Sequence, residues 1–353
     1  MKFTLFTNLF YFVLLPLIAI GCTMPQNQQA ERETLLIGLA GDVMLGRLVN
    51  EQISVSGYKY PWGDMLPLMQ KNDINLINLE TTLTTSDKIV PKVFNFKAEP
   101  DKVQSLTEAK IDVVTIANNH VLDFSEEGLT ETIEVLDNAG IKHVGAGKNI
   151  SEATSPVIIT KKNITVGIIG YTDNEPGWEA ASTKPGTAYV SVGDVDKVAA
   201  AVKKLKEQAD IVIFTIHWGP NMRQRPTKEF QDFAHKIIDL GVDVFHGHSA
   251  HVFQGIEVYN NKLILYDTGD FVDDYVVDAE LRNDRTFLYL AEVDKKGVKK
   301  LQLIPALIYY MQVNTAGGAD YDESVETLKT LSEEFNTKVA KTDKGVFVSW
   351  TQP

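Results

Sequence analysis

The chain has 353 residues, 44% of them apolar, which is enough for one large hydrophobic core or two modest ones. It carries 47 acidic and 34 basic residues, and its net charge is −13. Because nucleic-acid binding without sequence preference needs a basic surface, we expect no nucleic-acid partner. An anionic ligand would need cations gathered locally, or a metal.

The N-terminus predicts a secretory signal peptide over residues 1–21. Lys2 precedes an apolar run from Phe3 to Ile20, and the segment Ala19-Ile20-Gly21-Cys22 resembles a bacterial lipobox. In a lipoprotein, cleavage precedes the cysteine, so Cys22 would carry the lipid that anchors the chain to the membrane.

An uncleaved signal anchor is the alternative, because about 18 apolar residues approach the length that spans a bilayer. Both interpretations place residues 34–353 on the extracytoplasmic face of the cell membrane, in the periplasm or at the cell surface. Cys22 is the only cysteine, which excludes an intramolecular disulfide and leaves no second thiolate for a metal site.

The segment 22–33 is polar and glutamine-rich, which is typical of a tether. The rest of the chain shows no repeat or linker, so residues 34–353 predict a single domain. The pattern is least clear from about Asn314 onward.

Five short apolar runs predict buried strands, and each is followed by a polar residue that is able to bind a metal. The runs are Leu35–Ala40, Ile74–Leu79, Val113–Ala117, Ile211–Ile216 and Val242–Phe245. The polar residues that follow them are Asp42, Glu80, Asn118-Asn119-His120, His217 and His246-Gly247-His248.

Amphipathic stretches between these runs predict helices, and Asp194 is placed to cap the second of them. The helical stretches are Glu126–Ala139, Val195–Ala209 and Thr227–Leu240. Strands that alternate with helices indicate an α/β fold. From about Val252 the pattern becomes an antiparallel meander. Its predicted elements are strands Val252–Val258, Leu263–Tyr266, Thr286–Val293, Val298–Ile304 and Val346–Trp350, and a helix over Tyr321–Phe335.

The polar residues at the strand ends predict a metal site, because ligand sites in α/β folds gather at the carboxyl ends of strands. Oxygen and imidazole ligands without thiolate suit manganese, iron or zinc rather than calcium. Taken singly, each residue also has a structural interpretation. Asp42 fits a turn or a helix cap, Glu80 a solvated position, Asn119 a turn and His217 a buried core histidine.

Several runs, in order, resemble the signatures of the CapA family of poly-γ-glutamate capsule synthesis proteins. They are Gly41–Arg47, Asn78–Thr81, Ala117–Asp123, His217–Gly219, Gly247–His251, Ile256–Tyr259 and Leu263–Val272, within residues 36–275. The resemblance implies a four-layer αββα sandwich related to the calcineurin-like metallophosphoesterases. It also implies a role in surface-polymer assembly beside membrane-bound synthesis components.

The resemblance further implies a ligand set for one or two divalent ions. Asp42 corresponds to the first aspartate of the phosphoesterases, and Glu80 stands in place of their bridging aspartate. The remaining implied ligands are Asn119, His217, His248 and His251. His120 corresponds to the catalytic histidine that assists the leaving group or the phosphoryl transition state.

The chain departs from the phosphoesterase pattern in ways that weaken the first metal site. Met44 stands where a histidine ligand is expected, and a thioether is a poor ligand for a hard cation. Ser249-Ala250 separates the last two histidines, where one residue is usual. We therefore expect a single ion or a weakly bound second one. Asn221 and Met222 lie where the family commonly has a Glu-Tyr pair.

Two further residues are candidates for catalysis, and each has an alternative. Arg47 would bind a substrate phosphate or carboxylate, or else pair with Asp64 or Asp73. Asp123 would orient His120, or else cap the helix that follows it. Among the other polar residues, Asp267 and Asp270 would support the last histidines or lie in a polar loop, and His143, His235 and His246 are interpreted as structural.

Three functions stay open on the sequence. The first is a capsule-assembly protein whose site binds metal and an anionic polymer such as poly-γ-glutamate, with or without turnover. The second is a phosphoesterase or nucleotidase that acts on a small phosphate ester. The third is an interaction module with a vestigial site, which would need no metal. Met44 favours the first or the third over the second.

Overall fold

The computed structural model describes residues 1–5, 7–8 and 33–349. Most of the predicted signal peptide, the lipobox with Cys22 and nearly all of the tether lie outside these residues. No helix within the described residues is long and apolar enough to cross a membrane. Glu33–Pro353 forms one compact unit.

The larger of two mixed sheets has the strand order β19-β20-β17-β16-β1-β2-β5-β6, with β15 beside β1 and β18 beside β17. Strands β15, β1, β2, β5 and β6 run parallel, whereas the pairs from β16 to β20 are antiparallel. The bounds are β1 Leu35–Val43, β2 Ile74–Leu79, β5 Val113–Thr115, β6 Lys142–Val144, β15 Asp270–Val272, β16 Arg285–Asp294, β17 Gly297–Tyr309, β18 Gln312–Thr315, β19 Lys338–Thr342 and β20 Gly345–Ser349.

The smaller sheet has the order β13-β14-β12-β11-β9-β8, in which the four central strands are parallel. Its strands are β8 Val157–Lys161, β9 Ile164–Thr172, β11 Ile211–His217, β12 Val244–His248, β13 Ile256–Tyr259 and β14 Lys262–Leu265. Two short pairs complete the strands, namely β3 Thr82–Leu83 with β4 Lys97–Ala98, and β7 Ala146–Gly147 with β10 Gly186–Thr187.

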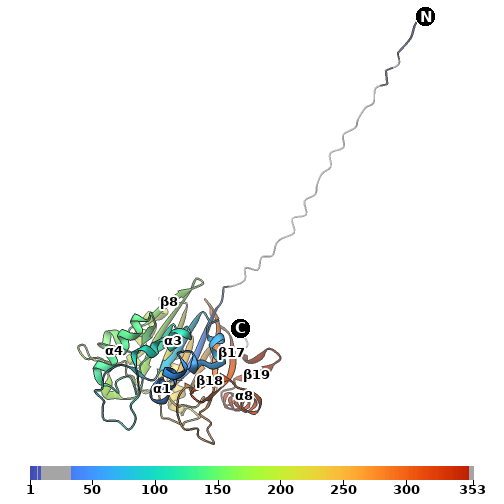
Figure 1. Ribbon diagram of the computed structural model, residues 1–353. Coiled ribbons are helices and arrows are strands. Elements are labelled where there is room, and N and C mark those ends of the chain that lie inside the picture. Colours follow the sequence, from blue (N-terminus) through green and yellow to red (C-terminus); the bar gives the residue numbers. More distant parts are fainter. Residues whose placement is uncertain (6, 9–32, 350–353) are drawn as a thin grey trace. The chain divides into compact units, whose positions relative to one another are not determined.

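Helices cover the outer faces of the sheets, and α8 lies beside β17 and β19 (Figure 1). The α-helices are α1 Arg47–Ser56, α2 Leu66–Met69, α3 Val103–Glu108, α4 Ser125–Asn138, α5 Ile150–Ala153, α6 Asp196–Lys206, α7 Lys228–Asp239 and α8 Gly318–Glu333. Three short 3-10 helices are η1 Tyr60–Met65, η2 Pro100–Lys102 and η3 Pro176–Trp178.

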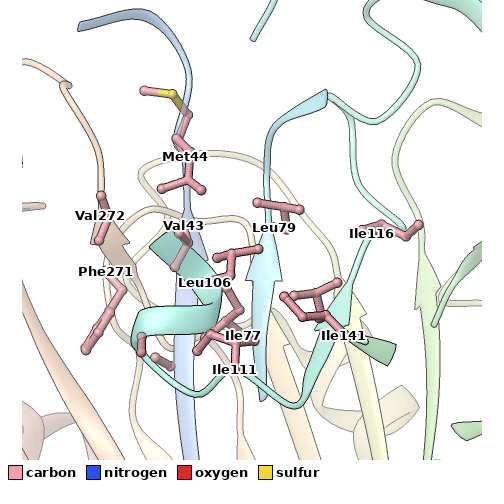
Figure 2. Packing of buried hydrophobic residues seen from close by; sticks show 14 of the residues in the cluster. Val43, Met44, Ile77, Leu79, Leu106, Ile111, Ile116, Ile141, Phe271 and Val272 are labelled. Atoms are coloured by element: carbon pink, nitrogen blue, oxygen red, sulfur yellow. The ribbon is translucent and has the colours of Figure 1, made fainter. Parts of the chain in front are cut away.

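Three apolar clusters separate four layers. The middle cluster joins the facing sides of the two sheets, with Leu39 of β1 and Ile213 of β11 among its members. An outer cluster packs the other face of the larger sheet against helices α1 to α4, and Figure 2 shows Val43, Leu79 and Val272 of three neighbouring strands in it. A third cluster packs the smaller sheet against α6 and α7. Since strands buried on both faces are typical of central strands in α/β folds, the layers follow from the uninterrupted apolar runs.

The α/β layered fold predicted from the sequence is confirmed. The prediction omitted β9, a central strand of the smaller sheet, and assigned its helix cap wrongly. Helix α6 begins after Val195, and no side-chain cap is present there. The meander is also more mixed than expected, because β14 and β15 each pair in parallel with an earlier strand.

Candidate metal centre

Strand register brings the candidate ligands together. Asp42 at the end of β1 is the register partner of Asn78 on β2 and of Asp270 on β15. Across the smaller sheet, His217 at the end of β11 is the partner of His248 on β12. Because parallel strands end at the same edge of a sheet, these side chains meet where the two sheets approach each other.

A glycine allows the closest of these approaches. The Asp42 N–H donates to the Gly269 carbonyl at 2.9 Å. A Cβ placed on Gly41 would lie 1.8 Å from the same carbonyl oxygen, so only glycine lets the loop before β15 reach β1. The carboxylate of Asp270 reaches the site through this contact.

One group of possible ligands consists of Asp42, His217 and His248, all buried. The Nδ1 atoms of the two histidines are 3.1 Å apart, and they lie 3.7 and 3.5 Å from Asp42 Oδ1. Thr215 Oγ1 is 3.1 Å from His248 Nε2 and fixes that ring from behind. The imidazole lone pairs can therefore converge beside the Asp42 carboxylate.

A second group consists of Asp42, Glu80, His251 and Asp270, again all buried. His251 Nδ1 lies 2.8 Å from Asp270 Oδ1 and 3.6 Å from Asp42 Oδ2. Glu80 Oε1 lies 3.8 Å from His217 Nε2, so the carboxylate of Glu80 lies next to the first group as well. Asp42 thus belongs to both groups and stands between them.

The site contains buried polar atoms that lack a protein partner. Among the described residues, no hydrogen bond reaches either carboxylate oxygen of Glu80, Nε2 of His217, Oδ1 of Asn119 or Oδ2 of Asp270. Buried polar atoms are nearly always paired. Because Glu80, His217 and Asp270 belong to groups whose ligand atoms lie within 4.8 Å of one another, their unpaired atoms indicate a bound cation. The residues present fit a divalent metal.

The electrostatics of the site agree with this. Burial, reinforced by the charge of Asp42, raises the pKa of Glu80 well above its ordinary value. Burial together with Asp273 and Asp42 does the same to the pKa of Asp270. Burial lowers the pKa of His248, which keeps its ring neutral. Without an ion, burial opposes ionisation of the two carboxylates, and a bound cation would reverse this. The same burial keeps the His248 ring in the neutral form that binds a metal.

His120 lies beside the second group and is held by Asp123. Its Nδ1 is 2.5 Å from Asp123 Oδ2, its ring stacks on Phe96, and its Nε2 is 3.7 Å from Glu80 Oε1. Burial lowers the pKa of His120 to about 4 and outweighs Asp123. The neutral ring therefore gives its proton to the Asp123 side and presents the Nε2 lone pair.

Asp123 is itself fixed by two further donors. The Phe96 N–H donates to Oδ2 at 2.7 Å, and Lys92 Nζ donates to Oδ1 at 2.9 Å and to the carbonyl of Asn119. The alternative that Asp123 caps the next helix is wrong, because Phe124 occupies the cap position and no side chain caps it.

Arg47 lines the cavity beside the site, as expected, but neither predicted carboxylate partner is correct. The guanidinium pairs with Asp274 at 3.1 Å. Asp64 binds Thr315, and Asp73 pairs with Lys162. The guanidinium also lies 5.5 to 5.9 Å from the rings of three aromatic residues, which are Phe94, Phe96 and Tyr275.

The structure explains the departures noted in the sequence. Met44 belongs to the outer apolar cluster (Figure 2). Its sulfur accepts the N–H of Gly46. The extra residue between the last two histidines is taken up by left-handed backbone at Ser249 (φ 118°) and His251 (φ 60°). The helix-cap interpretation of Asp42 is wrong, because Gly46 precedes α1 at the cap position.

The remaining predicted residues fall into place around the site. Asn119 is half-buried and lines the cavity, whereas its neighbour Asn118 is fully buried and donates to Asn78 at 3.1 Å. Asn78 in turn donates to Asp42 Oδ1 at 2.8 Å.

The three other histidines lie outside both groups. His246 lies between the hydroxyls of Thr215 and Thr268, His143 lies near Asp137, and His235 contacts Glu257.

A cavity of about 710 Å³ opens beside the second group. Polar groups from Arg47, Lys92, Asn119 and His120 line it, and so does His251 of the second ligand group. Its other walls come from Val93, Phe94, Phe96, Asn221, Met222, Tyr275, Val276 and Asn283. A ligand in this cavity would lie next to the metal centre.

Residues 36–275 match the family described as bacterial capsule synthesis protein PGA_cap. The chain belongs to this family. The match covers the same residues as the CapA resemblance predicted from the sequence, and it includes every candidate ligand.

Curated relatives carry names from capsule and polymer synthesis. A probable polyglutamine synthesis accessory protein of Mycobacterium tuberculosis, Rv0574c, is 34% identical over 87% of this chain and 86% of its own length. The capsule biosynthesis protein CapA of Bacillus anthracis is 30% identical, with coverages of 74% and 68%. The PGA biosynthesis protein CapA of Bacillus subtilis is 26% identical, with coverages of 86% and 82%.

Two solved structures align with this chain at TM-scores below 0.5. A phosphatase from Mycoplasma pneumoniae has a TM-score of 0.48 at 15% identity, covering 78% of this chain and 94% of its own. A putative 5'-nucleotidase from Staphylococcus aureus has a TM-score of 0.47 at 15% identity, with coverages of 85% and 58%.

Sequence reasoning missed residues that contribute to the site. Asp270 was considered only as support for the histidines, yet it belongs to the second ligand group. Two sequence features would have pointed to Asp270. It follows Gly269 within the run Leu263–Val272, which resembles the family, and it lies less than twenty residues after the last histidine, at the start of a short strand. Asn78 and Lys92 were not considered as supporting residues.

Proposed function

We propose that this member of the CapA family acts in the assembly of an anionic capsule polymer, poly-γ-glutamate or a related surface polymer, through a metal centre that binds the polymer. The observation that carries the proposal is the position of Asp42 in two buried ligand groups, in which both carboxylate oxygens of Glu80, Nε2 of His217 and Oδ2 of Asp270 lack a partner among the described residues. Family membership and the names of the relatives support the link to capsule synthesis.

The centre would hold two divalent ions. Asp42, His217 and His248 would bind one, and Glu80, His251 and Asp270 would bind the other with Asp42 shared. Oxygen and imidazole ligands without thiolate favour manganese, iron or zinc. When bound, such ions supply positive charge for carboxylate or phosphate oxygens and acidify bound water. Asp270 supplies the ligand that Met44 does not, so two ions are proposed where the sequence favoured one.

The residues of the cavity add to this charge and direct the ligand. Arg47 presents its guanidinium at the aromatic rim, with its side chain 37% exposed. Lys92 is largely enclosed and holds Asp123 against His120. His120 keeps its Nε2 free of a proton at neutral pH, since its pKa is about 4. Arg47 and Lys92 therefore place positive charge at the cavity, although the chain as a whole has a net charge of −13.

A second candidate function is hydrolysis of a small phosphate ester, and one observation favours it. Nε2 of His120, whose ring is held by Asp123, lies 3.7 Å from Glu80 Oε1, where it would exchange a proton with a phosphate ester bound at the centre. Assays of the metal-loaded protein with phosphomonoesters and phosphodiesters test this. Turnover that disappears in His217→Ala, which removes a ligand, supports hydrolysis, and metal retention without turnover supports polymer binding.

The location and partners of the chain are proposed as well. We place the mature protein on the extracytoplasmic face of the membrane, anchored by lipid on Cys22, beside membrane-bound components of polymer synthesis. Mass spectrometry of the N-terminal peptide tests the anchor. A lipid-modified Cys22 that disappears in Cys22→Ser supports it, and an intact N-terminus with Met1 contradicts it in favour of a signal anchor.

Elemental analysis of the natively purified full-length chain tests the metal centre. We expect close to two equivalents of manganese, iron or zinc in the wild type and a clear loss in His248→Ala, which removes a buried ligand. His143→Ala is the matched control, because His143 lies near Asp137 outside both ligand groups. Wild-type protein without stoichiometric metal would overturn the proposal and leave an interaction module.

A further inference from the structure

The cavity beside the metal centre contains a phenol that no established role explains. Tyr275 follows β15, and its hydroxyl is buried without a hydrogen-bond partner among residues 33–349. Its residue is half-buried and lines the cavity together with Asn119, His120 and His251. Since an unpaired buried hydroxyl costs free energy, its persistence beside a ligand cavity indicates a partner that arrives with the ligand.

The ring is held firmly, so the hydroxyl has a defined place. The ring centroids of Tyr275 and His251 lie 5.1 Å apart with an interplanar angle of 75°. The centroids of Tyr275 and Phe96 lie 5.9 Å apart. The guanidinium of Arg47 lies 5.9 Å from the ring centroid. The Tyr275 N–H also donates to Asp273 at 2.7 Å, which fixes the backbone. A ring clamped on several sides presents its hydroxyl with little loss of entropy on binding.

The hydroxyl lies in the field of the ligand carboxylates. An ordinary phenol is protonated at neutral pH, so the hydroxyl is available as a hydrogen-bond donor. A partner that accepts this hydrogen bond would be an oxygen of the ligand.

We propose that Tyr275 is a substrate-positioning residue whose O–H donates a hydrogen bond to an oxyanion held at the metal centre, a carboxylate of the polymer or an oxygen of a phosphate. This inference rests on the proposed metal centre and adds a recognition element for it. The metals would neutralise the anion, and Tyr275 would fix its orientation toward the cavity. The Arg47 guanidinium behind the ring would bind a second anionic group of the same ligand.

The chain offers a matched pair of variants. Tyr275→Phe removes only the hydroxyl and keeps the ring against His251. Tyr289→Phe removes another buried hydroxyl without a partner in the described chain, but this one lies in the middle cluster between the sheets. Because neither hydroxyl is paired, both variants should fold and unfold like the wild type or be slightly more stable. A purely structural hydroxyl would behave the same at both positions.

The experiment measures binding of inorganic phosphate and of tri-γ-glutamate to the manganese-loaded full-length chain by calorimetry, beside its metal content. We expect Tyr275→Phe to keep wild-type metal and to bind at least one probe about tenfold more weakly, and Tyr289→Phe to match the wild type. Weakening for phosphate alone identifies a phosphate ligand, and weakening for tri-γ-glutamate alone identifies the polymer.

Three outcomes would overturn the inference. They are unchanged affinity of Tyr275→Phe for both probes, loss of metal in that variant, and failure of the metal-loaded wild type to bind either probe. Absence of metal from the wild type is a separate result, because elemental analysis reads it directly, and it overturns the metal centre itself.

Discussion

Asp42 and Asp270 are register partners on the parallel strands β1 and β15, and both carboxylates belong to the ligand group that contains Glu80 and His251. The second of these strands has three residues and follows a tight loop at Gly269. A short strand late in the domain therefore delivers a carboxylate to the side of the first one. In the proposed centre, Asp270 would supply the ligand that Met44 does not, from a different part of the chain.

Asp270→Asn should separate metal binding from stability. We expect the bound metal to fall from two equivalents toward one, because Asn is a weaker ligand than a carboxylate. In metal-free protein the pKa of Asp270 is raised, so its favourable contribution is present at low pH and is lost as pH rises through the folded pKa. At pH 8 the free energy of unfolding of the variant should thus exceed that of the wild type by about 1–3 kcal/mol. At pH 4 the two values should be nearly equal.

Urea denaturation in chelator at both pH values, together with elemental analysis, measures these effects. Asp343→Asn on the exposed turn between β19 and β20 is the control and should change neither quantity. If Asp270→Asn retained two equivalents of metal, Asp270 would not be a ligand.

Asp123→Ala should be strongly destabilising, because the carboxylate accepts from three donors in a buried position. The donors are His120, the Phe96 N–H and Lys92. Removing one partner of a buried charged network costs about 3–5 kcal/mol. Chemical denaturation of the metal-free protein measures this loss. Asp137→Ala, whose carboxylate is 63% exposed, should cost less than about 0.5 kcal/mol. A loss below 1 kcal/mol for Asp123→Ala would mean that Asp123 does not hold His120.

Met44→His should fail to create a ligand, although it restores the residue type of the phosphoesterases. The side chain of Met44 lies in the outer apolar cluster, so an imidazole there would be buried without a polar partner. We expect unchanged metal content and a loss of about 1–3 kcal/mol in the free energy of unfolding. Met44→Leu conserves volume and should cost less than about 1.5 kcal/mol. A gain of metal in Met44→His would show that this backbone position does reach the centre.

His246 should make the metal-free protein less stable in mild acid. Burial lowers the pKa of His246 from 6.5 to about 4. The unfolded chain binds the proton first as pH falls, so stability is complete above pH 6.5 and is lost between pH 6.5 and about 4. The full effect is roughly 3 kcal/mol. His246→Asn should lower the slope of unfolding free energy against pH in that window by the amount that corresponds to about one bound proton. His235→Asn is the control and should keep the wild-type slope. Parallel curves for the wild type and His246→Asn would contradict the shift.

The sequence predicted the layers, and it placed most members of the two buried ligand groups at strand ends, because the signals were local. An apolar run followed by Asp42 or His217 records both a buried strand and the residue at its carboxyl end. The strand β9 was missed although it is as apolar as the others. It ends at Thr172, and the acidic residue that follows it, Asp173, was not interpreted as a signal of a strand end. Its place was set by pairing with β11, which is not a local property.

The part of the site that sequence reasoning could not supply depends on distance in the fold. The proximity of Asp270 to Asp42 is a matter of register between strands more than two hundred residues apart. The predicted cap at Asp194 was wrong for a local reason. Helix α6 begins one residue later than the pattern placed it, and no side chain caps its first turn. The predicted carboxylate partners of Arg47 were wrong, because its partner Asp274 lies in a loop that only the folded chain brings near.

Left-handed backbone at Arg47, Met222, Ser249 and His251 surrounds the centre. Each such conformation costs a non-glycine residue about 1–2 kcal/mol. In the metal-free chain no bound ion offsets this cost. We therefore expect the loop from His248 to His251 to be among the first segments to exchange its amide hydrogens with solvent. A bound ion would act as a removable crosslink between the two sheets, and its loss would be felt as local fraying around the pocket well before the core unfolds.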